Sequence, residues 1–177
     1  MSATVIDTNV LLVANGSHAD VSEKCRKECI NKLRAQQQGV TVIDDNFRIL
    51  REYQNKTRPH QPKGVGDIFL KWLLQNQRNT KYVHQVKLNE TEEHCFDEFP
   101  DADLQSSFDP PDRKFAAVAN AHPQRPVIWQ AADCKWLDWW KALSKSGIRV
   151  KFLCEEDACR FYKNKFPKKV KPELPKP

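Results

Sequence analysis

The stretch Thr4-Val5-Ile6-Asp7-Thr8-Asn9-Val10-Leu11-Leu12 joins two apolar runs through a short polar turn. The first run predicts a buried strand over residues 3–7, and the second predicts a helix directly after it. Strands that alternate with helices are typical of α/β proteins with a parallel sheet. The carboxyl ends of parallel strands lie along one edge of the sheet, where such folds build their sites. Asp7 closes the strand at this edge and is the first candidate site residue.

The rest of the chain continues this alternation. Further strands are predicted over residues 40–43, 82–88, 127–130 and 148–152, the last as an edge strand because cations alternate with its apolar residues. Helices are predicted over residues 20–38, 44–56, 67–77, 109–122, 134–144 and 155–163. Residues 57–66 read as a loop and the acidic residues 91–108 as an irregular insertion. The pattern predicts an α/β fold around a mainly parallel sheet of about five strands.

A chain of 177 residues is long enough to bury the core of one domain. We expect that domain over residues 1–162 and a flexible tail rich in lysine and proline over residues 163–177. No apolar run is long enough for a transmembrane helix, and the start lacks a basic-then-apolar signal peptide. These features predict a cytoplasmic protein.

Six cysteines occur without a CxxC pair or a regular spacing. Reduced thiols are the expectation for a cytoplasmic protein, ahead of disulfides or zinc. Cys25 and Cys29 lie in line with Val21 and Leu33 on one face of a predicted helix, so core packing explains both best.

The net charge of +6 is unevenly distributed along the chain. The tail carries six lysines against Glu173, a net of +5, which leaves +1 for the rest. Within that rest, residues 46–88 carry nine Lys/Arg against two acids, whereas residues 91–112 carry eight acids and no Lys or Arg. A basic half beside an acidic site suits a polyanion that is cut with the help of a metal ion. An ordinary solvated surface would explain the same distribution.

Three further carboxylates occupy comparable positions: Glu52 in a helix, Asp112 at a helix start and Asp133 after a strand. Acids that converge repel one another, so they either have raised pKa values or hold a cation. Oxygen ligands suit magnesium and manganese. The joint placement of Asp7, Glu52, Asp112 and Asp133 therefore predicts a Mg²⁺ or Mn²⁺ site.

Each acid also has a purely structural explanation. Asp7 and Asp133 would serve as caps, and Asp112 would complement the helix macrodipole in a first turn. Glu52 lies four residues from both Arg48 and Lys56, so an exposed ladder of ion pairs would explain it. Only the joint placement of the four acids favours a site.

Four blocks of sequence resemble the PIN-domain nucleases in order and spacing: residues 5–11 (VIDTNVL), 49–53 (ILREY), 112–119 (DRKFAAVA) and 132–136 (ADCKW). The resemblance covers residues 3 to about 153. It implies a three-layer α/β/α fold and metal-dependent endonucleolytic cleavage of single-stranded RNA. The metal-binding catalytic acids would be Asp7, Glu52, Asp112 and Asp133, with Asn9 as a polar neighbour that contacts substrate.

One position departs from the family pattern. Many members carry a further acid two residues after the fourth, where this chain has Lys135, and this argues against a second metal ion. Lys135, Arg113 or Lys114 would instead neutralise a substrate phosphate, although each would also be explained by surface charge or by pairing with an acid. Cations on or beside the 57–66 loop are further candidates for contact with an RNA backbone: Lys56, Arg58 and Lys63.

Two functions from different classes are compatible with these features. The leading one is a Mg²⁺- or Mn²⁺-dependent endoribonuclease, and the alternative is a PIN-fold nucleic-acid-binding or scaffold protein with a weakened metal site. A phosphatase with Asp7 as nucleophile is third, because Asn9 stands where that chemistry usually has a second Asp. A stand-alone domain of this size resembles bacterial toxin or antiviral defence nucleases. The expected partners are single-stranded RNA, an inhibitory antitoxin or regulatory protein and a second copy of the chain.

Overall fold

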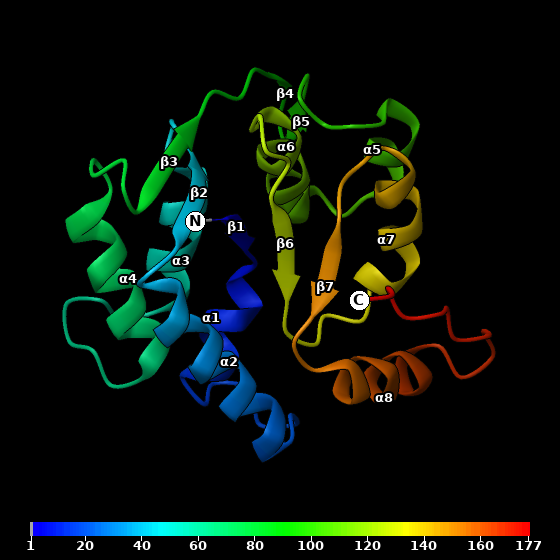
Figure 1. The fold of residues 1–177 in the computed structure, drawn as a ribbon. Helices are drawn as coiled ribbons and strands as arrows, with labels where there is room; N and C mark the ends of the chain where they lie inside the picture. Colours follow the sequence, from blue (N-terminus) through cyan, green and yellow to red (C-terminus); the bar gives the residue numbers. More distant parts are fainter. Residues whose placement is uncertain (1) are drawn as a thin grey trace.

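The centre of the protein is a five-stranded sheet in the order β3-β2-β1-β6-β7, with every neighbouring pair parallel. The computed structural model describes residues 2–177, and helices lie on both sides of the sheet (Figure 1). The strands are β1 (Ala3–Ile6), β2 (Val40–Asp44), β3 (Val83–Val86), β6 (Val127–Gln130) and β7 (Val150–Phe152). The prediction of an α/β protein with about five parallel strands is confirmed, as is the position of β7 at an edge.

β1 is the central strand, and its position explains why the opening stretch of the sequence is so apolar. Ala3 lies opposite Val40 of β2 on one side, and Ile6 lies opposite Trp129 of β6 on the other. All four residues of β1 are buried, as expected where helices cover both faces of a parallel sheet. Because the strands run in one direction, β1 and β6 end at the same edge, next to Asp7 and Ala131.

The helices begin where the sequence offers caps. Ser22 Oγ accepts from the N–H of Cys25 at 3.1 Å, and the Asp44 carboxylate accepts from the N–H groups of Arg48 and Ile49, both at 3.0 Å. The main helices are α1 (Thr8–Ala14), α2 (Glu23–Gln36), α3 (Arg48–Lys56), α4 (Val65–Asn76), α6 (Arg113–Ala121), α7 (Trp136–Lys145) and α8 (Glu155–Lys165). Helices α1, α2 and α4 pack against one another, whereas α6 packs on β1, β2 and β6. Within residues 2–177, no helix has the length and apolar character that crossing a bilayer requires.

The acidic insertion is ordered, so the prediction of an irregular segment over residues 91–108 was wrong. It contains an antiparallel pair, β4 (Glu90–Glu92) and β5 (Cys95–Phe96), then α5 (Ala102–Ser107), and the 3-10 turn η1 (Pro110–Asp112) follows it. Phe96, Phe99 and Phe108 are buried and anchor the segment. Phe108 stacks on Trp139 with ring centroids 3.9 Å apart. Aromatic burial outweighs the repulsion among the exposed acids of the insertion.

The C-terminal segment lies against α7. Helix α8 continues to Lys165, so the expected boundary at residue 162 falls inside it. Trp140 Nε1 donates to the carbonyl of Glu173 at 2.8 Å, and Lys141 Nζ lies 3.5 Å from the Glu173 carboxylate. Residues 166–177 form no helix or strand. The flexibility expected of the tail stays a prediction.

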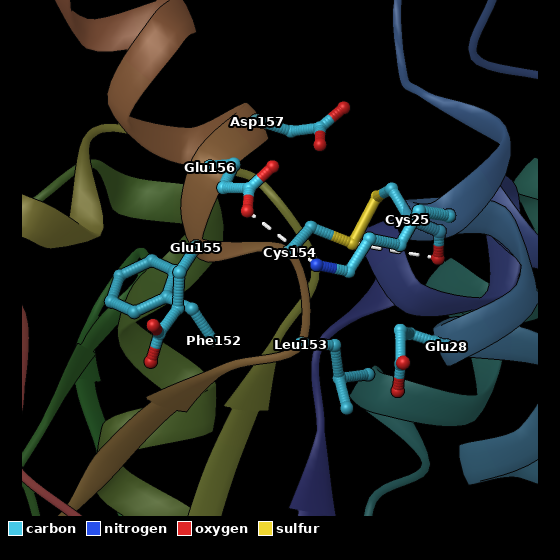
Figure 2. Close-up of a pocket in the computed structure, with 9 residues that line it drawn as sticks. Cys25, Glu28, Phe152, Leu153, Cys154, Glu155, Glu156 and Asp157 are labelled. Atoms are coloured by element: carbon cyan, nitrogen blue, oxygen red, sulfur yellow. Dashed lines mark hydrogen bonds and ion pairs between the residues drawn. A yellow bond between two sulfur atoms is a disulfide. The ribbon is translucent and has the colours of Figure 1, made fainter.

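The expectation that all cysteines are reduced thiols is wrong for one pair. Cys25 in the first turn of α2 and Cys154 just before α8 form a disulfide (Figure 2). The two residues are 129 positions apart, so no local spacing predicts the bond. Cys29 is free and fully buried beside them, and burial raises the pKa of its thiol to about 12. Cys29 is a buried core residue, as expected. Cys25 is also buried in the core, but in addition it forms the disulfide.

Candidate functional site

Asp7 lies at the junction between β1 and α1 and is only 4% exposed. Its Oδ2 accepts from the backbone N–H of Asn9 at 2.9 Å, so the carboxylate caps α1 as well as closing β1. Gln130, at the end of β6, donates from its amide to the same oxygen at 3.1 Å while its carbonyl accepts from Trp136 Nε1 at 3.2 Å. A strand end, a helix start and a neighbouring strand therefore fix Asp7 in one position.

A lysine ammonium stands among the acids that follow β6 and precede α6. Lys135 Nζ lies 3.5 Å from Asp112 Oδ2 and 4.0 Å from Asp133 Oδ2, and it also donates to Asp109. Asp109 is a residue of this site that sequence reasoning missed. The two prolines between Asp109 and Asp112 form η1, and a 3-10 turn places residues i and i+3 on one side. The Asp-Pro-Pro-Asp spacing was the available signal.

Glu52 joins the same region from α3. Lys114 Nζ lies 3.1 Å from Glu52 Oε1, with a side chain only 9% exposed, and Thr8 donates to Glu52 Oε2. The alternative explanation of Glu52 as part of an exposed ladder with Arg48 and Lys56 does not hold. Arg48 instead pairs with Asp44 at 3.2 Å and with Glu90 at 3.7 Å. Glu52 therefore points toward α6 and α1, as a site residue would.

The electrostatics show that the acids of the cluster act on one another. Burial, then the charges of Asp112 and Asp133, raise the pKa of Asp7 well above its usual range. Burial and the charge of Asp133 raise the pKa of Asp112 to about 6, although Lys135 opposes the shift. Burial likewise raises the pKa of Asp133 against the effect of Lys135. One buried and two half-buried acids with raised pKa values at one sheet edge are a typical property of a functional site.

The acids also act on the lysine. Although burial opposes it, the hydrogen bond to Asp109 and the charges of Asp133 and Asp112 raise the pKa of Lys135, so this ammonium stays charged at neutral pH. Lys135 thus supplies one positive charge to a site with a surplus of negative ones. This lysine stands two residues after Asp133, at the position where the sequence carries a cation in place of the acid of the family pattern.

The donor set fits a hard divalent cation. Four carboxylates from β1, α3, η1 and the segment after β6 offer oxygen only, which suits Mg²⁺ or Mn²⁺. Among residues 2–177, no three carboxylates bring one oxygen each within 4.8 Å of one another. Two carboxylates and several waters would therefore hold an ion here, and Asp7 and Asp112 are the candidate pair because, after burial, the charge of Asp112 is the largest cause of the raised pKa of Asp7.

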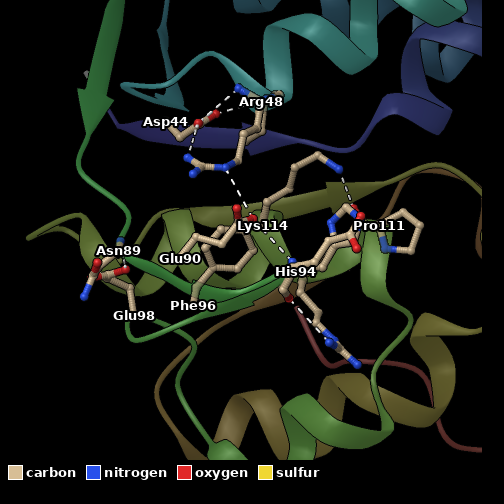
Figure 3. Close-up of polar contacts among 12 residues, drawn as sticks. Asp44, Arg48, Asn89, Glu90, His94, Phe96, Glu98, Pro111 and Lys114 are labelled. Atoms are coloured by element: carbon tan, nitrogen blue, oxygen red, sulfur yellow. Dashed lines mark hydrogen bonds and ion pairs between the residues drawn. The ribbon is translucent and has the colours of Figure 1, made fainter.

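A groove of about 440 Å³ lies beside Glu52 (Figure 3). Its walls are α3, the start of α6 and the β4–β5 pair, and its cations are Arg48, Arg51, Lys56 and Lys114. Figure 3 shows Arg48 reaching from α3 between Asp44 and Glu90, so this cation is already neutralised. Among the described residues, neither Arg51 nor Lys56 forms an ion pair with a carboxylate. These two exposed cations are available to a phosphate.

The predicted substrate-binding residues fall into different environments. Lys56 lines the groove, and Lys114 and Lys135 bind the acids. Arg58 and Lys63 lie in the loop before α4, where their N–H groups donate to the Asp67 carboxylate at 2.8 and 3.0 Å. Both side chains are exposed but do not line the groove.

Arg113, the remaining predicted substrate contact, has its guanidinium turned to the acidic insertion. It is buried, and its guanidinium donates to the carbonyl of Phe108 at 3.0 Å and to that of His94 at 3.4 Å. It therefore fastens the acidic insertion to α6. Its neighbour Lys114 points to the site, because successive residues of a helix lie about 100° apart around the axis.

Asn9 and two unpredicted residues position the acids. Asn9 Oδ1 accepts from the N–H of Ala132 at 3.1 Å, which ties α1 to the segment that carries Asp133. Thr8 holds Glu52, and Gln130 holds Asp7. Thr8 and Gln130 adjoin predicted site positions, which is the only signal that sequence offered for them. No protein-family model, curated protein or solved structure matches this chain.

Proposed function

We propose that the protein is a metal-dependent endoribonuclease that hydrolyses phosphodiester bonds of single-stranded RNA. The observation that carries the proposal is the group of three acids with raised pKa values, Asp7, Asp112 and Asp133, of which the last two lie within 4.0 Å of the ammonium of Lys135. One lysine does not balance the negative charge of these carboxylates, so the cluster favours a further cation. A divalent ion would supply that charge. The resemblance of four sequence blocks to PIN-domain nucleases supports RNA as the substrate.

Asp7 and Asp112 would hold Mg²⁺ or Mn²⁺, with help from Asp133 and with Glu52 at greater distance. When bound, the ion supplies a Lewis acid for the scissile phosphate and lowers the pKa of a water that attacks it. Gln130, Asn9 and Thr8 keep the acids in position, so little reorganisation is needed when the charge of the reacting phosphate increases. Lys135 is a point charge beside the reacting phosphate.

The groove beside Glu52 supports binding of a nucleic-acid backbone. Arg51 and Lys56 are exposed along it, and Lys114 lies at its inner end next to Glu52. Cations spaced along a groove that leads to a buried acidic site would bind phosphates on one side of the scissile bond. Such contacts release counterions, so affinity should fall steeply with salt.

A cytoplasmic enzyme that cleaves RNA needs restraint, so an inhibitory antitoxin or regulatory protein is part of the proposal. A second copy of the chain is the other expected partner. A disulfide is uncommon in the cytoplasm, where such bonds are mostly transient or redox-sensing. The cytoplasmic location is thus tested by the state of Cys25 and Cys154 in cells as well as by fractionation.

The test is cleavage of a fluorescent single-stranded RNA by purified protein with Mn²⁺, Mg²⁺ or EDTA. We expect activity with either ion and none in EDTA, and a loss of about 100-fold or more in Asp112→Asn. Asp45→Asn is the matched control, because Asp45 is an exposed aspartate at the end of β2. Equal activity of Asp112→Asn and the unmodified protein would reject the site.

A second function has its own support. Lys135 and Lys114 already pair with Asp112, Asp133 and Glu52 and offset part of their negative charge, so the fold is also suited to a nucleic-acid-binding or scaffold protein with a weakened metal site. Salt-sensitive RNA binding without cleavage, unchanged by EDTA, would favour that function over the nuclease.

A further inference from the structure

Three cysteine sulfurs meet beside the segment that follows β6, where the N–H of Cys154 donates to the carbonyl of Ala131 at 3.0 Å. Cys25 and Cys29 lie one turn apart on α2, Cys154 precedes α8, and one sulfur from each lies within 4.8 Å of the others. The Cys25–Cys154 disulfide accounts for two of them. The third, Cys29 Sγ, is fully buried and lies 3.9 Å from Cys154 Sγ.

The spacing of the third sulfur fits a tetrahedral thiolate site. Zinc–sulfur bonds of about 2.3 Å at tetrahedral angles place two ligand sulfurs about 3.8 Å apart. The Cys29–Cys154 separation of 3.9 Å agrees with this distance. A disulfide needs no third cysteine, so the position of Cys29 is the feature that the disulfide leaves unexplained.

Hydrogen bonds hold the frame around the sulfurs in addition to the disulfide. Ser22, the cap of α2, donates to the Asp157 carboxylate of α8 from its N–H at 2.7 Å and from its hydroxyl at 2.9 Å. Arg160 then donates to the same carboxylate at 3.1 Å and to the carbonyl of Asp20. This network links the N-termini of α2 and α8, so reduction of the disulfide leaves the three thiols facing one another.

The surroundings of Cys25 and Cys154 suit thiolates, whereas burial and the charges of Glu28 and Asp157 raise the pKa of Cys29, which needs the cation to lose its proton. Cys25 is in the first turn of the 14-residue helix α2, and Cys154 caps the 11-residue helix α8, so both sulfurs are near positive ends of helix dipoles. A cavity of about 160 Å³ lies against Cys25 and Cys154 and is lined by Lys24, Glu28 and Asp157 among others (Figure 2). This cavity has room for a water as a fourth ligand.

We infer that Cys25, Cys29 and Cys154 of the reduced protein bind one thiophilic divalent cation of the zinc class, and that the disulfide is the oxidised form of this site. A dithiol reduces the disulfide to two thiols by thiol–disulfide exchange and itself becomes a disulfide, whereas a phosphine does so with one water and becomes the phosphine oxide. Binding of the cation by three thiols then releases three protons to solvent. A small-molecule disulfide, which is reduced to two thiols, takes two electrons from Cys25 and Cys154, restores their bond and releases the ion. Thiolate sulfur selects zinc over magnesium, so this site is chemically distinct from the acidic one.

Cobalt(II) tests the inference, because cobalt–thiolate bonds absorb in the near ultraviolet whereas cobalt held by carboxylates does not. Protein reduced with a phosphine and desalted without oxygen should bind one equivalent with this absorption, and zinc should displace it. The oxidised protein, with free thiols only at Cys29, Cys95, Cys134 and Cys159, should show no such band. Zinc should also raise the Tm of the reduced protein.

Cys29→Ala separates the metal site from the disulfide. This variant keeps Cys25 and Cys154, so thiol counting should still find the disulfide after oxidation, whereas the reduced variant should lose tight one-to-one binding. Cys159→Ala on α8 is the control, because Cys159 is free and outside the group of three, and it should bind as the unmodified protein does. The inference fails if the reduced protein shows no cobalt–thiolate band, or if Cys29→Ala or the oxidised protein binds equally well. Magnesium-dependent activity is not needed for any of these readouts.

Discussion

At the scale of single residues, Lys135 decides how much charge the acidic site holds by itself. Its ammonium contacts Asp109 and lies within 4.0 Å of Asp112 and Asp133, with a side chain 30% exposed. Three carboxylates around one lysine leave the site with a negative surplus even before Asp7 and Glu52 are added. The ammonium of Lys135 therefore competes with an external cation for the carboxylates, but it does not balance all of their negative charge.

The first prediction concerns metal binding by variants of Lys135. Lys135→Ala should bind Mn²⁺ roughly tenfold more tightly than the unmodified protein. The positive charge of the Lys135 ammonium, about 4 Å from the carboxylates, no longer competes with the ion. Lys135→Asp should bind a second ion. Calorimetric titration in the absence of substrate measures both, with Lys141→Ala on the exposed face of α7 as the control. Two tight ions in the unmodified protein would contradict this account.

The second prediction concerns pH and Asp112. The folded-state pKa of about 6 exceeds the ordinary 3.8, so the folded protein binds this proton more tightly than the unfolded chain. The stability that results is fully present below the unfolded pKa and is lost as pH rises through about 6. Asp112→Asn removes the repulsion and should stabilise the metal-free protein at pH 7 by on the order of 2 kcal/mol.

Thermal melts in EDTA at pH 5 and pH 7 check this second prediction. The advantage of Asp112→Asn should shrink at pH 5, where the unmodified carboxyl is mostly protonated. Asp45→Asn should follow the unmodified protein at both values. A constant difference between Asp112→Asn and the unmodified protein at both pH values would show that charge is not the cause.

At the scale of elements, local sequence predicted what local chemistry determines. The apolar run before Asp7 became β1, and Asp44 and Ser22 cap helices that begin near the predicted residues. The ordered insertion was missed because Phe108 at its end is buried by contact with Trp139 of α7, far along the chain. The disulfide is a long-range contact of the same kind, whereas Arg113 donates to the carbonyl of Phe108 only five residues earlier. No periodicity in a single sequence encodes them.

The third prediction tests the contact between α4 and α1. A Cβ on Gly66 would collide with the carbonyl of Leu11 and lie 2.8 Å from Asn15 Oδ1, and neither atom is free to move. The Leu11 carbonyl accepts from the N–H of Asn15 within α1, and Asn15 Oδ1 accepts from the N–H of Asp67. Gly66→Ala should cost about 1–3 kcal/mol.

Gly39→Ala is the control for Gly66→Ala, because its new Cβ would meet nothing nearer than 3.6 Å. Urea unfolding midpoints measure both variants. We expect a clear shift for Gly66→Ala and a change within about 0.5 kcal/mol for Gly39→Ala. Similar shifts in the two variants would mean that general loss of chain flexibility, and not the α1–α4 contact, sets the effect.

At the scale of the whole molecule, positive charge is concentrated in the C-terminal tail while the catalytic candidates lie in the α/β domain. The last segment packs along α7 through Glu173, so removing it would also uncover Trp140. Replacing charges is therefore a cleaner test of the tail than truncation.

The fourth prediction is that changing Lys168, Lys169, Lys171 and Lys176 together to Gln weakens RNA binding and lowers its salt dependence without abolishing cleavage. Fewer phosphate contacts release fewer counterions, so the slope of log affinity against log salt should become shallower. Fluorescence anisotropy over a range of salt concentrations measures the slope. Gln at the exposed lysines Lys27 and Lys71 of α2 and α4 is the control, and an equal effect there would mean that total charge matters and the tail does not.

The Cys25–Cys154 bond turns most of this protein into a covalent ring. The ring spans 129 residues of separation and contains four of the five strands of the sheet, whereas β1 and Asp7 lie outside it. In the chain-entropy treatment, closing a ring of this size raises the free energy of the unfolded ensemble by about 5 kcal/mol. That equals the entire stability of many single domains. The fraction of molecules that are folded, and with it their resistance to proteases, therefore follows the thiol–disulfide balance of the compartment in which the chain resides.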